Sequence, residues 1–186
     1  MANTYVKKFI LFISTLFLSN LLYATNFQYF VNQPINQTLT TPYSYYTYQP
    51  SPMMDKAIES LPAYSNIKKC ASGNITDAII ILKPILSYQA QSTILYGDLH
   101  VKVYQTRSNS ETNPDNFIKK MKISVWKVMQ FDQVTIGHYV NEIYTELLKK
   151  LTSEIDGLKI DKNYPTNGSY CDLLTTIKKS SVNLNY

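Results

Sequence analysis

Apolar side chains recur along residues 78–129 with the period of β-strands. Residues 78–86 form a nearly continuous apolar run, AIIILKPIL, which predicts a strand covered on both faces. Residues 95–105 and then residues 117–129 alternate apolar with polar positions, as strands with one buried face do. Pro84 lies inside the first run and predicts either a sheet edge or a bulge there.

Two segments in which apolar residues recur with the period of a helix flank these three strands. Residues 134–155 carry an apolar side chain every three or four positions, which predicts a long amphipathic helix. A shorter apolar stripe begins at Pro52 and stops before Pro62. The order of elements predicts an α+β fold. It would consist of an antiparallel sheet of three to four strands, with a short N-terminal helix and a long C-terminal helix packed on one face.

The first 24 residues have the layout of a secretory signal peptide. Lys7 and Lys8 precede an apolar run over residues 9–22, and Ala24 closes it. The run is shorter than the roughly 20 residues that a membrane-spanning helix needs, although an uncleaved anchor is the alternative. Because Thr25 and not a cysteine follows, we expect no lipid anchor there. The leader predicts an exported protein, periplasmic or secreted.

Residues 25–54 contain no charged side chain and are rich in Tyr, Asn, Gln, Thr and Pro. The prolines predict that this segment forms neither a regular helix nor an internal strand. We therefore interpret residues 25–52 as an extended or disordered arm, either a docking segment or a linker. A single domain over residues 53–186 would follow, and that length is enough to bury a core.

Cys70 and Cys171 are the two cysteines of the chain. An even pair in an oxidising compartment predicts a disulfide, here closing a loop of about 100 residues. Two free thiols or a reactive pair are the alternative, although redox cysteines are normally as close as in C-x-x-C.

The formal net charge of +5 is mildly positive, and two of the lysines lie in the leader. This charge suits an anionic membrane or cell-wall polymer. It does not indicate a nucleic-acid partner, because Arg107 is the sole arginine, and the planar fork of arginine dominates phosphate and base recognition.

Candidate catalytic groups are few. Asp98 and His100 share one strand face, but no third ligand is near in sequence, so we expect no metal site and no cofactor. His138 and Glu142 lie one helical turn apart and predict a surface pair. Neither a serine elbow nor a phosphate-binding glycine loop occurs. We therefore expect a non-enzymatic protein. The alternative is a small secreted hydrolase that assembles its site from these four residues only in three dimensions.

The best candidate for a binding surface is the polar face of the second and third strands. Its members are Tyr96, His100, Lys102, Lys120, Lys122 and Trp126. Together they combine aromatic rings with cations.

A polar arm is followed along the chain by MMDKAIESL, AIIILKPIL, ILYGDLHVKVYQ and YVNEIYTELLKKLTSEI. This order of segments resembles that of bacterial envelope accessory proteins. These include ABC-transport auxiliary components, lipopolysaccharide-assembly helpers and penicillin-binding-protein activators. The resemblance covers residues 53–155 and is one of hydrophobic pattern, so no functional residue is carried over. Those families are usually lipoproteins, and this chain lacks the acylated cysteine.

The resemblance implies an accessory role in the envelope. The expected partner is another envelope protein or a surface polymer, with peripheral membrane contact as a further expectation. A carrier of a small ligand or lipid, with a cleft between sheet and helices, is another alternative.

Overall fold

The structure is a computed structural model, and it describes residues 27–42, 45–71, 76–105, 117–130 and 136–155, with Leu158, Cys171 and Leu174. The predicted signal peptide lies outside the described residues. So do the loop over residues 106–116 and most of the C-terminal tail.

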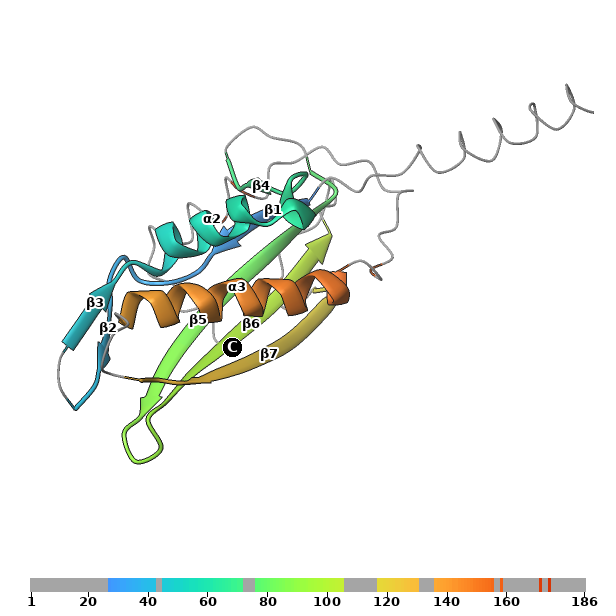
Figure 1. Ribbon diagram of the computed structural model, residues 1–186. Coiled ribbons are helices and arrows are strands. Elements are labelled where there is room, and N and C mark those ends of the chain that lie inside the picture. The colour runs from blue at the N-terminus through green and yellow to red at the C-terminus, as the bar shows by residue number, and fades with distance from the viewer. Residues whose placement is uncertain are drawn as a thin grey trace, which may run out of the picture.

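Five strands form one mixed sheet in the order β4-β1-β5-β6-β7 (Figure 1). Strands β5, β6 and β7 form an antiparallel meander, whereas β1 runs parallel to both β4 and β5. Their bounds are β1 Phe27–Val31, β4 Lys68–Lys69, β5 Ala78–Gln89, β6 Ile94–Gln105 and β7 Lys119–Val128. The α+β class is confirmed. The prediction of an antiparallel sheet of three to four strands fits the meander but misses the two parallel strands.

The segment that we interpreted as an extended or disordered arm supplies an inner strand of this sheet. β1 pairs with β5 from Phe27 opposite Ala78 to Val31 opposite Leu82. The prediction of a disordered arm over residues 25–52 is therefore wrong for the described residues. Its prolines do not break β1, because all of them come after Val31. Farther along the same segment, β2 (Gln37–Thr40) pairs with β3 (Tyr45–Tyr48) as a separate two-stranded hairpin.

Both predicted helices are present and cover the same face of the sheet (Figure 1). Helix α2 spans Pro50–Ser60, two residues earlier than predicted, and a short 3-10 turn, η1 (Pro62–Tyr64), follows it. Proline is tolerated in a first helical turn because its missing N–H has no intrahelical partner there. Helix α3 spans Ile136–Ile155 and buries the predicted apolar stripe.

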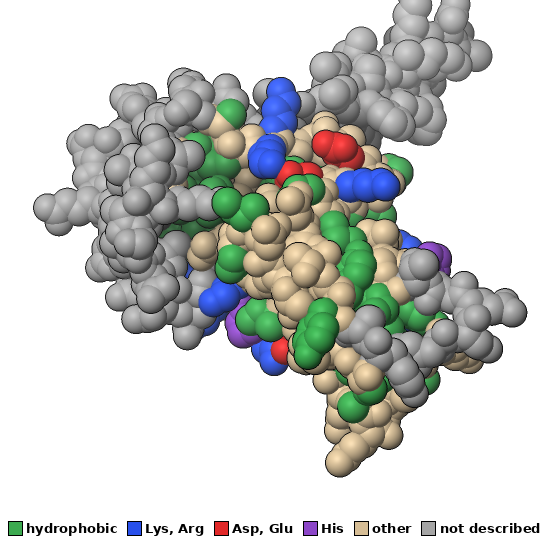
Figure 2. Space-filling view, turned by 90° about the vertical axis from the view of Figure 1, so that its left-hand side faces the viewer, with side chains coloured by type: hydrophobic (Ala, Val, Ile, Leu, Met, Phe, Trp, Pro, Cys, Tyr) green, Lys and Arg blue, Asp and Glu red, His purple; other side chains and the backbone are tan. Residues whose placement is uncertain are grey.

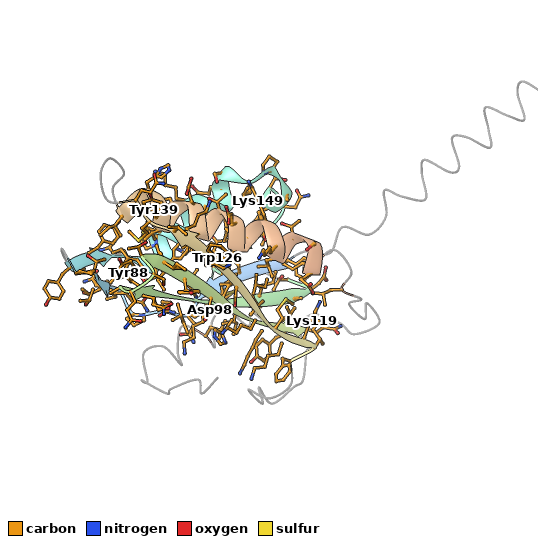
Figure 3. All side chains as sticks on the ribbon, turned by 60° about the horizontal axis from the view of Figure 1, so that its bottom comes forward. Tyr88, Asp98, Lys119, Trp126, Tyr139 and Lys149 are labelled. Carbon is orange, nitrogen blue, oxygen red and sulfur yellow. A yellow bond between two sulfur atoms is a disulfide. The ribbon has the colours of Figure 1, made fainter. Side chains whose placement is uncertain are left out.

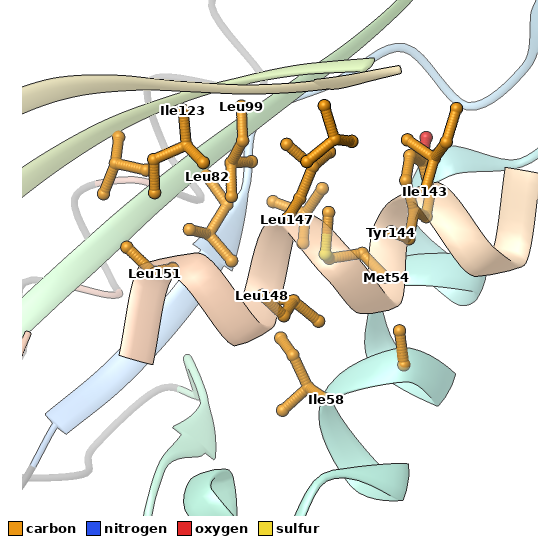
Figure 4. Close-up of a cluster of buried hydrophobic side chains, with 14 of the residues drawn as sticks. Met54, Ile58, Leu82, Leu99, Ile123, Ile143, Tyr144, Leu147, Leu148 and Leu151 are labelled. Atoms are coloured by element: carbon orange, nitrogen blue, oxygen red, sulfur yellow. The ribbon is translucent and has the colours of Figure 1, made fainter. Parts of the chain in front are cut away.

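The core fills the layer between the helices and the sheet. Leu147 and Leu151 of α3 meet Leu99 of β6 and Ile123 of β7, while Met54 of α2 packs beside α3 (Figure 4). The two cavities described below lie at the margins of this layer. Core side chains fill the space between α3 and the sheet, whereas the first of these cavities lies between α2 and β1.

Gly97 sets how closely α3 approaches β6. A Cβ atom at this position would lie 2.2 Å from Cγ2 of Ile143, well inside van der Waals contact. A glycine in a strand often marks such a close approach. The missing side chain therefore lets the helix pack directly over the middle of the sheet.

Pro84 explains where the parallel pairing ends. It lies within β5 opposite Leu99, just beyond the point at which β1 has stopped. The carbonyl of Pro84 accepts a hydrogen bond from the Gln33 side chain, on the side that β1 would have occupied. The nitrogen of a strand residue faces the same side as its carbonyl, so the missing N–H interrupts no ladder. The predicted local edge at Pro84 is confirmed.

Candidate functional site

The six predicted contact residues lie on one face of the sheet, turned away from the helices; we call it the outer face. In Figure 3 the helices lie above the sheet and the outer face looks down. The strand register brings all six residues together. Tyr96 is opposite Trp126, His100 is opposite Lys122, and Lys102 is opposite Lys120. Side chains directly opposite in an antiparallel pair have Cβ atoms about 4.5–5.5 Å apart, so the six form rows across two strands.

One end of the outer face is exposed and apolar. Trp126 is 61% exposed and Val128 is 52% exposed, and both project from the outer face of β7. Tyr96 lies between Ser87 and Trp126 in the register and is half-buried. We call these three residues, Tyr96, Trp126 and Val128, the exposed end.

The opposite end of the outer face is covered. Ile79, Ile81 and Tyr104 are buried there against Cys171 and Leu174. Cys171 is held in place by a disulfide to Cys70, with Cα atoms 5.5 Å apart, and the predicted bridge is therefore confirmed. The disulfide attaches part of the C-terminal tail to the sheet.

Lys102 belongs to the covered end, and its prediction as an exposed contact residue is wrong. It is only 5% exposed, and its Nζ lies 5.7 Å from the centroid of the Phe117 ring. This is the distance of a cation–π contact. Strand alternation assigns the correct face but cannot show that another segment packs over it.

Asp98 and His100 lie in the middle of the outer face, where charges from both strands meet. Lys122 Nζ is 2.9 Å from Asp98 Oδ2, and Ser124 Oγ donates a hydrogen bond to Asp98 Oδ1. Burial opposes ionisation of Asp98, but the bonds from Ser124 and Lys122 outweigh it and lower the Asp98 pKa. Burial, and then the positive charge of Lys122, lower the pKa of His100 below its ordinary value of 6.5. At neutral pH the positive charge of this face therefore comes from its lysines.

The four residues of the hydrolase alternative do not converge. His138 and Glu142 of α3 form the predicted surface pair, with Nε2 and Oε1 3.2 Å apart. They lie on the helix side of the sheet, whereas Asp98 and His100 lie on the outer face. The described residues contain no cluster of three or more His, Cys, Asp or Glu side chains that could hold a metal ion.

Lysine contacts link α3 to the edge strand β7, an arrangement that the sequence pattern did not reveal. Lys150 of α3 donates a hydrogen bond to the backbone carbonyl of Ser124, 2.9 Å away. Lys119 pairs with Glu154 at 2.8 Å, and Lys127 pairs with Glu146 at 2.7 Å. Charged side chains along an edge strand block its pairing with another strand.

Two cavities lie at the margins of the helix layer. The first, of about 580 Å³, is lined by Tyr29, Asp55 and Lys69 among others. These three polar groups satisfy one another, since Tyr29 donates to Asp55 Oδ1 at 3.0 Å and Lys69 pairs with the same carboxylate. Burial, reinforced by the charge of Asp55, raises the pKa of Tyr29 above its usual value. The second cavity, of about 550 Å³, lies beside the β2–β3 hairpin.

No protein-family model matches the sequence, and no curated protein matches it. Several solved structures share a weak likeness with this chain, and three of them follow. A Xanthomonas campestris protein of family model DUF330 is 12% identical with a TM-score of 0.42, covering 86% of this chain and 90% of that one. A minor lipoprotein from Acinetobacter baumannii is 12% identical with a TM-score of 0.40, covering 76% and 98%. Uncharacterized lipoprotein B from Nitrosomonas europaea is 8% identical with a TM-score of 0.38, covering 71% and 83%.

Likenesses of this size transfer no activity and no site residue to this chain. Within the described part of the chain, no helix has both the length and the apolar character needed to cross a membrane.

Proposed function

We propose that this chain is an exported, non-enzymatic accessory protein of a bacterial cell envelope, which binds another envelope protein through the exposed end of its outer face. The predicted leader supports export. The disulfide between Cys70 and Cys171 suits an oxidising compartment.

The observation that carries the proposal is the exposure of Trp126 beside Tyr96 on an otherwise well-packed sheet. Trp and Tyr are enriched among the residues that contribute most to protein–protein binding, and such anchors usually lie within a polar rim. Lys120 and Lys122 lie on the same strand and the same face, on one side of that anchor, and Lys122 also pairs with Asp98 at 2.9 Å. A cationic rim accelerates association with a partner of negative surface charge. The proposed partner is therefore a protein with an acidic surface around an apolar pocket.

The test is site-specific photo-crosslinking in the producing cells. A photoreactive amino acid at position 126 should crosslink one protein, which mass spectrometry identifies and which is then purified. Binding of the purified pair should weaken at least tenfold in Trp126→Ala and should fall with rising salt. Lys149→Ala, an exposed lysine on α3, is the matched control and should bind normally.

Two outcomes would contradict the proposal. The first is a purified partner that binds Trp126→Ala as tightly as the unmodified protein. The second is a crosslinked product that resists protease and consists of polysaccharide, because the partner would then be a surface polymer.

A further inference from the structure

The cavity beside the β2–β3 hairpin is built from uncharged polar groups and aromatic rings. It lies among the loop after β1, strand β3, the start of α2 and one turn of α3, and we call it the hairpin groove. Figure 2 looks onto the side of the molecule that carries the hairpin, and the middle of that view is dominated by uncharged side chains and backbone. This agrees with the sequence, in which residues 25–54 carry no charge.

Three amide side chains line the groove from three separate segments. Asn36 precedes β2, Gln49 precedes α2, and Asn141 lies on α3; all three are exposed. Each amide offers two N–H donors and one carbonyl acceptor. Among the residues that line the groove, Lys56 is the only charged one, and no carboxylate contributes.

Two tyrosines line the groove: Tyr46 is half-buried, and Tyr48 beneath it is a core residue that is 5% exposed. The rings of Tyr46 and Tyr48 are stacked, with centroids 5.9 Å apart and planes 11° apart. The hydroxyl of Tyr48 donates a 2.6 Å hydrogen bond to Gln37 Oε1 on the paired strand. Tyr46 lies against Gly137, where an added Cβ would come within 2.8 Å of the tyrosine oxygen. These contacts hold both rings in position before any ligand arrives, which reduces the entropy lost on binding.

We propose that the hairpin groove binds an uncharged oligosaccharide. Each sugar hydroxyl both donates and accepts hydrogen bonds, which matches amides better than it matches charged side chains. The C–H face of a sugar ring can pack on an aromatic ring, whose face carries partial negative charge, and the half-buried Tyr46 is the ring that the groove offers for this contact. An anionic ligand would call for more than one cation, and preferably an arginine fork. The volume lies within the roughly 300–1,000 Å³ typical of small-ligand sites.

This site is separate from the protein-binding surface on the outer face. It also gives a role to the uncharged segment, whose Asn, Gln and Tyr content the docking proposal does not use. The two proposals can therefore succeed or fail independently.

The experiment is titration of the full-length oxidised protein with three soluble probes, followed by calorimetry and amide NMR shifts. The probes are a tetramer of N-acetylglucosamine, maltohexaose, and dextran sulfate as the anionic comparison. At least one neutral probe should bind and shift the amide signals of Asn36, Gln49 and Asn141. The double variant Asn36→Ala with Asn141→Ala should weaken that binding about tenfold, because two hydrogen bonds are lost.

Gln91→Ala is the matched control, since Gln91 is an exposed amide in the turn between β5 and β6, outside the groove lining. It should bind like the unmodified protein, and so should Trp126→Ala. All three variants should keep the same thermal midpoint, because the substituted side chains are exposed. The proposal is overturned if neither neutral probe binds at millimolar concentration, if dextran sulfate alone binds, or if the double variant binds unchanged.

Discussion

The two faces of the central sheet come from the same strands, yet they differ in how completely other segments cover them. On the inner face, the alternate residues of β6 are buried beneath α3. On the outer face, one end is covered by Cys171 and Leu174, while Trp126 at the other end stays in solvent. The difference teaches that alternation along a strand assigns a side, whereas the elements that pack over that side decide which residues remain available for binding.

Removing the disulfide should cause the largest loss of stability, because it frees the segment that covers one end of the outer face. The double variant Cys70→Ser with Cys171→Ser should lower the free energy of unfolding by about 4–5 kcal/mol, since the bridge closes a loop of roughly 100 residues. Urea denaturation measures the loss. Reduction of the unmodified protein should give the same midpoint as the variant; if reduction leaves the midpoint where it was, the bridge does not stabilise this fold.

Replacing one large apolar side chain on each face of the sheet by alanine compares how much the two faces contribute to stability. Leu147→Ala should cost about 2–5 kcal/mol, because the side chain is fully buried between α3 and the sheet. Trp126→Ala should change stability by no more than about 0.5 kcal/mol, because surface substitutions generally have small effects. Denaturant midpoints of the two variants provide the test. A loss of stability in Trp126→Ala as large as that in Leu147→Ala would mean that something covers the exposed end.

Adding one methyl group at Gly97 should cost about 1–3 kcal/mol, because the new Cβ would overlap Ile143. The cost should shrink in an Ile143→Ala background, where the overlapping atom is absent. Thermal unfolding of the unmodified protein, Gly97→Ala, Ile143→Ala and the double variant measures the coupling between the two positions. Equal costs in both backgrounds would contradict the assigned contact between α3 and β6.

The smallest expected effect concerns His100 on the outer face. Its pKa is lowered on folding, by burial and then by Lys122, so the unfolded chain binds the proton more readily than the folded one. His100 therefore favours the folded state above about pH 6.5, and this contribution is lost as the pH falls through the lowered pKa. NMR titration should place the imidazole midpoint below 6.5, and Lys122→Ala should move it upward. A midpoint above 6.5 would reverse the expected pH dependence.

The elements with a clear hydrophobic period were predictable from sequence. The alternation over residues 95–105 and 117–129 gave β6, β7 and their two faces, and the stripe over residues 134–155 gave α3. Strand β1 was missed because it is five residues long and lies in an uncharged segment with many prolines. Its partner β5 is remote in sequence, so the pairing that stabilises β1 leaves no local pattern.

The candidate sites were predictable to different degrees. The outer-face residues were found because cross-strand neighbours follow from alternation, but the burial of Lys102 depends on how Phe117 packs. The hairpin groove was missed, although its signal was present as the absence of charge over residues 25–54. Without the knowledge that these residues fold, that composition indicates disorder as readily as it indicates a neutral binding site.

The hydrogen bond from Lys150 to the Ser124 carbonyl has a consequence for crowded surroundings. It occupies an acceptor along the ten-residue border strand β7, to which a second molecule could otherwise add a strand of its own. Self-assembly through a shared sheet is thereby discouraged, even at high local concentration. A partner strand that approaches this edge would therefore meet a lysine side chain in place of a free carbonyl.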